Sequence, residues 1–282
     1  MTFTDIFDRY VAPLEPIETD IPSSGSPPFP VKAILFDIYG TLFISASGDI
    51  GRLADSRDSR NALSALVSDY KLEISAKNLL QQYRDAIEKE HKRLREQGNP
   101  FPEVQSDEIW RHILGMDHPS AAQAFALSFE LIINPVYPMP NLAFMLERLK
   151  EAGIKPGIVS NAQFYTPLLF AYFSGDRPEN LGFDPDLLFY SYRVGQAKPS
   201  PLMFGKAREK LAEYGISPES VLFVGNDMQN DIFPARTQGF QTALFAGDRR
   251  SLRLRRDIPE CRGIDPDMVI TDLSQLPAMI GY

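Results

Sequence analysis

The sequence predicts an α/β protein with a doubly wound, parallel, Rossmann-like sheet and an inserted bundle of helices. Two observations support this prediction. Short runs of mostly apolar residues recur along the chain, as expected of strands that a parallel sheet buries on both faces. These runs cover residues 31–36, 156–159, 187–190, 221–224, 242–245 and 268–270. Segments with helical spacing separate several of them, and this alternation is typical of doubly wound sheets.

Two connecting segments carry clear helix signals. Residues 141–152 place apolar side chains on one helical face and stop before Gly153. Residues 201–214 do the same and stop before Gly215. A glycine directly after the last periodic residue is a common helix terminator. We therefore expect a helix in each segment.

Residues 46–136 interrupt the alternation. Four successive segments each place apolar side chains on one helical face, with no strand pattern between them. They centre on residues 63–70, 79–94, 109–114 and 122–133. This pattern predicts a helical bundle that forms a cap, inserted between the first and second strands. The α/β core would then comprise residues 31–45 and 137–282.

Residues 1–30 form an N-terminal extension rich in proline and serine. Residues 4–11 predict a short amphipathic helix with Ile6 and Phe7 to bury. The run at residues 23–28 resists regular structure. We expect the extension to lie across the core or to stay mobile.

Composition narrows the possible partners. The chain has 282 residues, a hydrophobic fraction of 44% and a formal net charge of -8. Such a charge is poorly suited to binding nucleic acid or an anionic membrane, but a small-molecule substrate feels only its own pocket. No apolar run approaches the ~20 residues that span a bilayer. The single cysteine, Cys261, and the lack of a secretory signal favour the cytoplasm. The oligomeric state is not predicted.

Polar side chains follow the predicted strands. They are Asp37 after the first run, Ser160 and Asn161 after the second, Lys198 eight residues beyond the third, and Asn226, Asp227, Asn230 and Asp231 after the fourth. Ligands of open parallel sheets bind at the carboxyl ends of the strands. We therefore expect these side chains to converge at one edge of the sheet.

These residues resemble the four motifs of the haloacid dehalogenase (HAD) superfamily, in the same order. The first motif is similar to residues 36–42, the second to 159–161, the third to Lys198-Pro199, and the fourth to 224–227 with Asp231. Each motif alone is a weak signal. All four in order, with a helical insert after the first, identify a hydrolase of this type.

The resemblance implies roles for these residues. Asp37 would be a nucleophile that forms a covalent intermediate. Ser160 would hold oxygens of the transferred group, and Lys198 would neutralise Asp37 and the developing oxyanion. The remaining expected substrate-binding residues are Tyr39, Gly40, Thr41 and Asn161.

The resemblance also implies a magnesium site. Carboxylates that meet at one place repel each other unless a cation lies among them, and a hard divalent ion such as Mg²⁺ takes oxygen ligands. The expected ligands are Asp37, the carbonyl of Tyr39, Asp227 and Asp231. If Asn226 takes the first position of the fourth motif, Asp231 becomes the important acid, but the spacing of Asp227 to Asp231 favours Asp227.

Tyr39 departs from the phosphatase pattern. Phosphatases of the superfamily carry a second aspartate two residues after the nucleophile, which protonates the leaving group and activates water. A phenol with a pKa of about 10 is a poor base at neutral pH. Losing such a group typically costs ~10²–10⁴ in rate, or about 3–5 kcal/mol of barrier. Tyrosine at this position is instead similar to the 2-haloacid dehalogenases.

Dehalogenases also use an arginine of the first cap helix, and the first part of the cap contains Arg52, Arg57 and Arg60. None of these arginines lies in a matching motif, so we expect a solvated surface. A second group of arginines near the C-terminus predicts a solvated loop. Its members are Arg249, Arg250, Arg253, Arg255 and Arg256. His91, His112 and His118 have unrelated spacings, and no zinc site is expected from them.

Three functions stay open at this point. The leading hypothesis is a Mg²⁺-dependent phosphatase that cleaves a small phosphate monoester through an aspartyl-phosphate at Asp37. The second is hydrolytic dehalogenation of a 2-halo acid, which Tyr39 favours. The third is a phosphate-binding or regulatory protein with little turnover.

Overall fold

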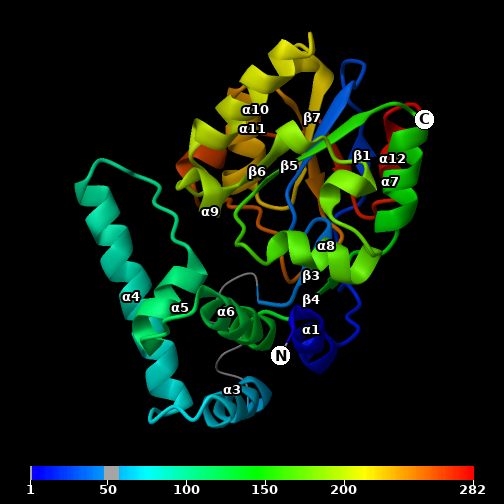
Figure 1. The fold of residues 1–282 in the computed structure, drawn as a ribbon. Coiled ribbons are helices and arrows are strands. Elements are labelled where there is room, and N and C mark those ends of the chain that lie inside the picture. Colours follow the sequence, from blue (N-terminus) through cyan, green and yellow to red (C-terminus); the bar gives the residue numbers. More distant parts are fainter. Residues whose placement is uncertain (1, 48–56) are drawn as a thin grey trace.

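The computed structural model describes residues 2–47 and 57–282 and contains a central seven-stranded sheet (Figure 1). The strand order is β1-β9-β8-β7-β2-β5-β6. The strands are β1 (Ser24–Gly25), β2 (Ala33–Phe36), β5 (Lys155–Ser160), β6 (Leu188–Tyr190), β7 (Val221–Gly225), β8 (Gln241–Phe245) and β9 (Met268–Ile270). Every neighbouring pair is parallel except β1 with β9. The prediction of a doubly wound α/β fold is confirmed.

Helices cover both faces of the sheet. Its two faces pack into separate apolar clusters, because Ile34 and Phe36 of β2 lie in one and Ala33 and Leu35 in the other. The first face is covered by α7 (Leu142–Glu151), α8 (Thr166–Ser174) and α12 (Gln275–Met279). The second is covered by α10 (Pro201–Glu213) and α11 (Phe233–Thr237). The predicted helices at 141–152 and 201–214 therefore correspond to α7 and α10. A short helix, α9 (Ser191–Val194), follows β6.

Four helices form a separate group beside the sheet (Figure 1). They are α3 (Arg57–Asp69), α4 (Ala76–Glu96), α5 (Ser106–Leu114) and α6 (Pro119–Ile133). Trp110 is fully buried at their centre, stacked on Tyr83 with ring centroids 4.4 Å apart. Within the described ranges, no helix is both long and apolar enough to cross a membrane. We refer to residues 57–133 as the cap.

Two short strands that the sequence pattern did not reveal lie where the cap joins the core. β3 (Phe43–Ser45) pairs antiparallel with β4 (Val136–Pro138). Three residues are too few to show a period of two, which explains why they were missed. The predicted cap boundary at residue 46 lies directly after β3, and residues 48–56 lie outside the described part of the chain.

The N-terminal extension lies across both parts of the molecule. Helix α1 (Phe3–Tyr10) begins at a capping box of Thr2 and Asp5, and it buries Ile6 and Phe7. It packs on α6 of the cap, and the ring of Phe7 stacks on Tyr172 of α8 at 4.7 Å. Further along, β1 adds to the edge of the sheet. The extension was expected either to lie across the core or to stay mobile, and the structure shows the first of these.

Candidate active site

A cavity of about 400 Å³ opens where the carboxyl ends of β2, β5 and β7 face the cap. The core contributes Asp37, Tyr39, Asn161, Lys198 and the acidic residues of the 225–231 segment. The cap contributes side chains from α4, α6 and the loop between α4 and α5, among them Tyr83, His91, Glu103 and Glu130. A ligand in this cavity would touch both parts of the molecule.

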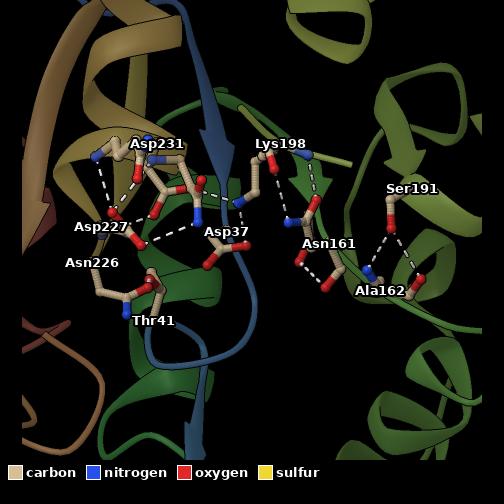
Figure 2. Close-up of polar contacts among 12 residues, drawn as sticks. Asp37, Thr41, Asn161, Ala162, Ser191, Lys198, Asn226, Asp227 and Asp231 are labelled. Carbon is tan, nitrogen blue, oxygen red and sulfur yellow. Dashed lines mark hydrogen bonds and ion pairs between the residues drawn. The ribbon is translucent and has the colours of Figure 1, made fainter. Parts of the chain in front are cut away.

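Asp37 lies at the end of the central strand. Its backbone N–H donates to the Val224 carbonyl of the neighbouring strand (2.9 Å), which fixes the backbone where the strand ends. Oδ1 accepts a bond from Lys198 Nζ at 2.6 Å (Figure 2). The described residues make no bond to Oδ2. One carboxylate oxygen is therefore neutralised, and the other is available to a ligand.

Lys198 connects two buried carboxylates. Its Nζ donates to Asp37 and also to Asp231 Oδ1 at 2.5 Å (Figure 2). Asn161 holds its backbone, because Oδ1 of Asn161 accepts from the Lys198 N–H at 2.6 Å and Nδ2 donates to the Lys198 carbonyl. Burial alone lowers the pKa of Lys198, but the attraction of Asp231 and Asp37 outweighs it and the net shift is upward. Lys198 therefore carries its charge at neutral pH.

Asp231 is fully buried beneath Asp37. Its Oδ2 accepts the Asp227 N–H at 3.0 Å. Burial raises the pKa of Asp231 above its ordinary value, against the opposing attraction of Lys198. A Cβ on Gly225 would come within 2.5 Å of this carboxylate, so only glycine fits there. Asp231 thus serves the site by positioning Lys198.

Asp227 faces away from Lys198 and toward Arg255. The guanidinium of Arg255 donates to both carboxylate oxygens, at 3.1 Å from Nε to Oδ1 and 2.7 Å from Nη2 to Oδ2. Oδ1 also accepts bonds from the N–H groups of Gln229 and Asn230, and Oδ2 accepts one from Asn230 Nδ2. The expected metal ligation by Asp227 is not supported by this geometry, because both of its oxygens already have donors.

Two cations, Lys198 and Arg255, thus face three carboxylates. The repulsion that led us to expect a divalent ion is largely compensated by the protein itself. In the described part of the chain, no group of three or more acidic, histidine or cysteine side chains is arranged to hold a metal. The expectation that Arg255 lies in a solvated loop is wrong. Its side chain is half-buried and pairs with Asp227.

Four other expected site residues lie at different depths. Asn161 lines the cavity, whereas Ser160, Gly40 and Thr41 do not. The Ser160 hydroxyl is buried and donates to the Asn161 carbonyl. Thr41 donates to Oδ1 of Asn226 at 3.2 Å, and Gly40 packs on the same side chain. Thr41 and Gly40 therefore shape the cavity through Asn226, which does line it.

Tyr39 lines the cavity but cannot serve as an acid or base. Its hydroxyl bonds to Oγ1 of Thr166 at 2.9 Å. Burial raises the pKa of Tyr39 well above its ordinary value, and only the bond to Thr166 opposes this. The described core thus provides no acid–base group at the position two residues after Asp37.

The arginines at the start of the cap were expected on a solvated surface. Arg57 and Arg60 are exposed on α3, which confirms this for the two, and Arg52 lies outside the described residues. His91 does line the cavity, with its Nε2 atom buried and unpartnered among the described residues. Glu103 and Glu130 also line it, and neither lies in a motif that would have identified it from the sequence.

The fold and the site together define a capped α/β enzyme with a candidate aspartate nucleophile at the end of its central strand. The chain belongs to the haloacid dehalogenase-like hydrolase family, whose model matches residues 31–251. The predicted membership is confirmed, and the protein is a hydrolase.

Known relatives include both reaction types. The glyceraldehyde 3-phosphate phosphatase of Methanopyrus kandleri is 25% identical over 232 residues, which cover 80% of this chain and 89% of the relative. A HAD phosphatase from Thermococcus onnurineus has a TM-score of 0.54 at 20% identity, over 89% of this chain and 98% of that one. The L-2-haloacid dehalogenase of Xanthobacter autotrophicus has a TM-score of 0.51 at 21% identity over the same shares. The two structural likenesses show the fold alone.

Proposed function

We propose that the protein is a phosphatase that hydrolyses a small phosphate monoester, with Asp37 as the nucleophile. The observation that carries this proposal is the pairing of Asp37 with Lys198 at the cavity wall, which leaves one carboxylate oxygen free to attack. The sequence likeness to a named phosphatase over most of both chains supports the same reaction. A cavity of about 400 Å³ suits a small ester.

The proposed chemistry has two steps. In the first, an oxygen of Asp37 attacks phosphorus, and the bond to the leaving oxygen breaks to give an aspartyl-phosphate. In the second, water attacks that intermediate and releases phosphate. In both steps Lys198 stabilises negative charge from a position that is already fixed by Asp231 and Asn161.

We propose Mg²⁺ as the cofactor, with fewer ligands than the sequence predicted. Asp37 and Asn226 place a carboxylate and an amide on the cavity wall, and such oxygens are ligands that Mg²⁺ accepts. The Asn226 oxygen accepts a single bond, from Thr41 at 3.2 Å, whereas both oxygens of Asp227 are held by the charged guanidinium of Arg255. When bound, the ion would neutralise charge on the phosphoryl group. Asn226→Asp should then tighten Mg²⁺ binding measured by calorimetry, whereas Asp227→Asn should not weaken it. The reverse order would restore Asp227 as the ligand.

A panel of substrates tests the reaction. Wild-type protein should release phosphate from small esters such as glycerol phosphates, and a chelator should reduce the rate. Asp37→Asn should abolish turnover while the protein keeps its unfolding temperature. Turnover that survives in Asp37→Asn would refute the nucleophile assignment.

A second candidate function follows from Tyr39, the feature that resembles the 2-haloacid dehalogenases. In that case Asp37 would attack carbon and displace a halide. Halide release from 2-chloropropionate that a chelator does not affect would favour this reaction over the phosphatase. No turnover in either assay, with phosphate still bound, would favour the binding or regulatory protein instead.

A further inference from the structure

Five carboxyl side chains line the cavity, and they are not equivalent. They are Asp37, Glu103, Glu130, Asp227 and Asp231. The three aspartates each bond to Lys198 or Arg255. Neither glutamate has a cationic partner among the described residues. An unpaired carboxyl group in such a place is a candidate for proton transfer.

Glu130 belongs to the cap helix α6 and lines the same cavity as Asp37. Its Oε1 accepts a bond from Asn134 Nδ2 at 3.1 Å. The other end of the Asn134 amide is fixed to the end of β3, because its Oδ1 accepts bonds from Ser45 Oγ (2.9 Å) and the Ser47 N–H (3.1 Å). The Glu130 carboxyl is therefore held at a defined position relative to the segment that carries Asp37.

The surroundings of Glu130 favour its protonated form. Burial raises the pKa of Glu130, although bonds from Asn134 and Tyr165 oppose the shift. The charge of Glu130 in turn contributes to the raised pKa values of Tyr39, Tyr83 and Tyr165, so these three phenols lie near it. Its hydrogen-bond donors, Asn134 and Tyr165, are neutral, and no described cation stabilises its carboxylate by opposite charge.

Glu103 is the competing carboxyl group, but its oxygens are committed elsewhere. Oε2 accepts from the Ser191 hydroxyl at 2.6 Å, and Oε1 accepts from the Val104 N–H and from Gln163. The bonds from Ser191 and Gln163 join the loop between α4 and α5, which we call the cap loop, to the core. Glu103 is therefore a positioning residue, and Glu130 is the better acid.

We infer that Glu130 is the acid–base residue that replaces the aspartate missing at Tyr39; this inference rests on the proposed phosphatase function. As Asp37 attacks phosphorus and the ester bond breaks, Glu130 gives its proton to the leaving oxygen and becomes a carboxylate. The carboxylate then takes a proton from the water that attacks the aspartyl-phosphate. The phosphorus–Asp37 bond breaks, phosphate leaves, and Glu130 is protonated again.

Leaving-group dependence tests this role, using Glu130→Gln in the full-length chain. For an alkyl ester such as glycerol 3-phosphate, whose alkoxide needs a proton, kcat/KM should fall by ~10²–10⁴. For p-nitrophenyl phosphate, whose nitrophenolate leaves unprotonated, kcat/KM should fall by less than ~10-fold on the same reasoning. The aspartyl-phosphate should accumulate, because its hydrolysis lacks a base. This accumulation should be seen as an initial burst of nitrophenolate release followed by a slower steady rate. Glu88→Gln, on the exposed face of α4, is the matched control and should behave as wild type.

A second variant distinguishes an acid from a structural support. Adding Tyr39→Asp to Glu130→Gln should restore much of the turnover of the alkyl ester, because it supplies a carboxyl group two residues after Asp37. An equal loss for both esters, or no rescue by Tyr39→Asp, would overturn the inference. If wild type turns over the alkyl ester and Glu130→Gln does so equally, the inference alone fails. If wild type hydrolyses no phosphate ester, the proposed function fails and takes the inference with it.

Discussion

Lys198 shows how single residues balance charge in this site. It is buried between Asp37 and Asp231, and its backbone is held on both sides by Asn161. Removing one partner of a buried ionic group is costly, because the remaining charges lose their compensation. One side chain thus compensates the charge of both carboxylates, and the proposed reaction uses the same side chain to stabilise negative charge.

Lys198→Met should test how much stability the protein derives from this charge compensation. It should lower the free energy of unfolding by about 3–5 kcal/mol at neutral pH, because two buried carboxylates lose their cation. Urea unfolding followed by circular dichroism measures the change. The double variant Lys198→Met with Asp231→Leu should recover part of this loss. A double variant that is less stable than Lys198→Met would show that the carboxylate is not the source of the instability.

Glu130 should impose a pH dependence on stability. A carboxyl group whose pKa is raised by folding contributes stability fully below its unfolded pKa of about 4.3, and loses it as pH rises through the folded value. Glutamine cannot ionise. The unfolding free energy of Glu130→Gln relative to wild type should therefore increase as the pH rises above about 4.3. A difference that does not increase above this pH would contradict the raised pKa.

For single residues, the sequence predicted which side chains meet at the site better than it predicted their individual partners. Asp37, Lys198 and Asp231 meet as expected because each follows a strand of a parallel sheet, and the fold determines where strand ends lie. The partner of Asp227 was not predictable. Arg255 lies 28 residues further along in an irregular loop, and no periodicity indicates where a loop side chain points.

Among the elements, the loop between α4 and α5 joins the cap to the core. The Ala197 N–H donates to the Phe101 carbonyl at 2.9 Å, and Asn99 Nδ2 donates to the Gly195 carbonyl at 2.9 Å. This contact lies directly before Lys198 in the chain. The contacted residues lie one and three positions before Lys198, so the loop between α4 and α5 and the lysine are connected through a short stretch of backbone.

Glu103→Ala should loosen this contact. Each hydrogen bond lost is worth about 1 kcal/mol, so we expect KM to rise about five- to tenfold. Hydrogen exchange of residues 98–105 should become faster while α10 stays protected. Unchanged exchange in the loop, together with an unchanged KM, would mean that Glu103 does not hold the cap loop.

Regular elements were predictable from the sequence, and irregular ones were not. The helices α3 to α6 have a repeating apolar face long enough to recognise, and the six parallel strands are mostly apolar. The strands β1, β3 and β4 have two or three residues each, too few for any pattern. The elements that could not be predicted are therefore those that join the cap to the core, namely the β3–β4 pair and the loop between α4 and α5.

In the molecule as a whole, helix α1 fastens the cap to the core. Phe7 stacks on α8 of the core, while Arg9 pairs with Asp69 of the cap at 2.6 Å. The helix also packs along α6, which carries Glu130. Movement of the cap would have to separate these apolar contacts.

Phe7→Ala should therefore act on both parts at once. A buried phenylalanine truncated to alanine typically costs about 3–5 kcal/mol of stability. Hydrogen exchange should become faster in both α6 and α8. Phe29→Ala, at a side chain that is 54% exposed, is the control and should change neither. Faster exchange in α8 alone would show that α1 does not restrain the cap.

The pairing of β1 with β9 has a consequence for how the chain folds. Nearby contacts of the extension join residues 231 and 227 positions apart, at Ile17 with Asp248 and Thr19 with Ala246. During synthesis, residues 17–25 leave the ribosome long before their partners exist. Contacts of such high sequence separation form slowly, because the entropy of closing the long loop is lost before the contact contributes favourable free energy. The outer edge of β9 should thus be the last part of the sheet to be covered, and it is the edge where two nascent chains could pair with each other.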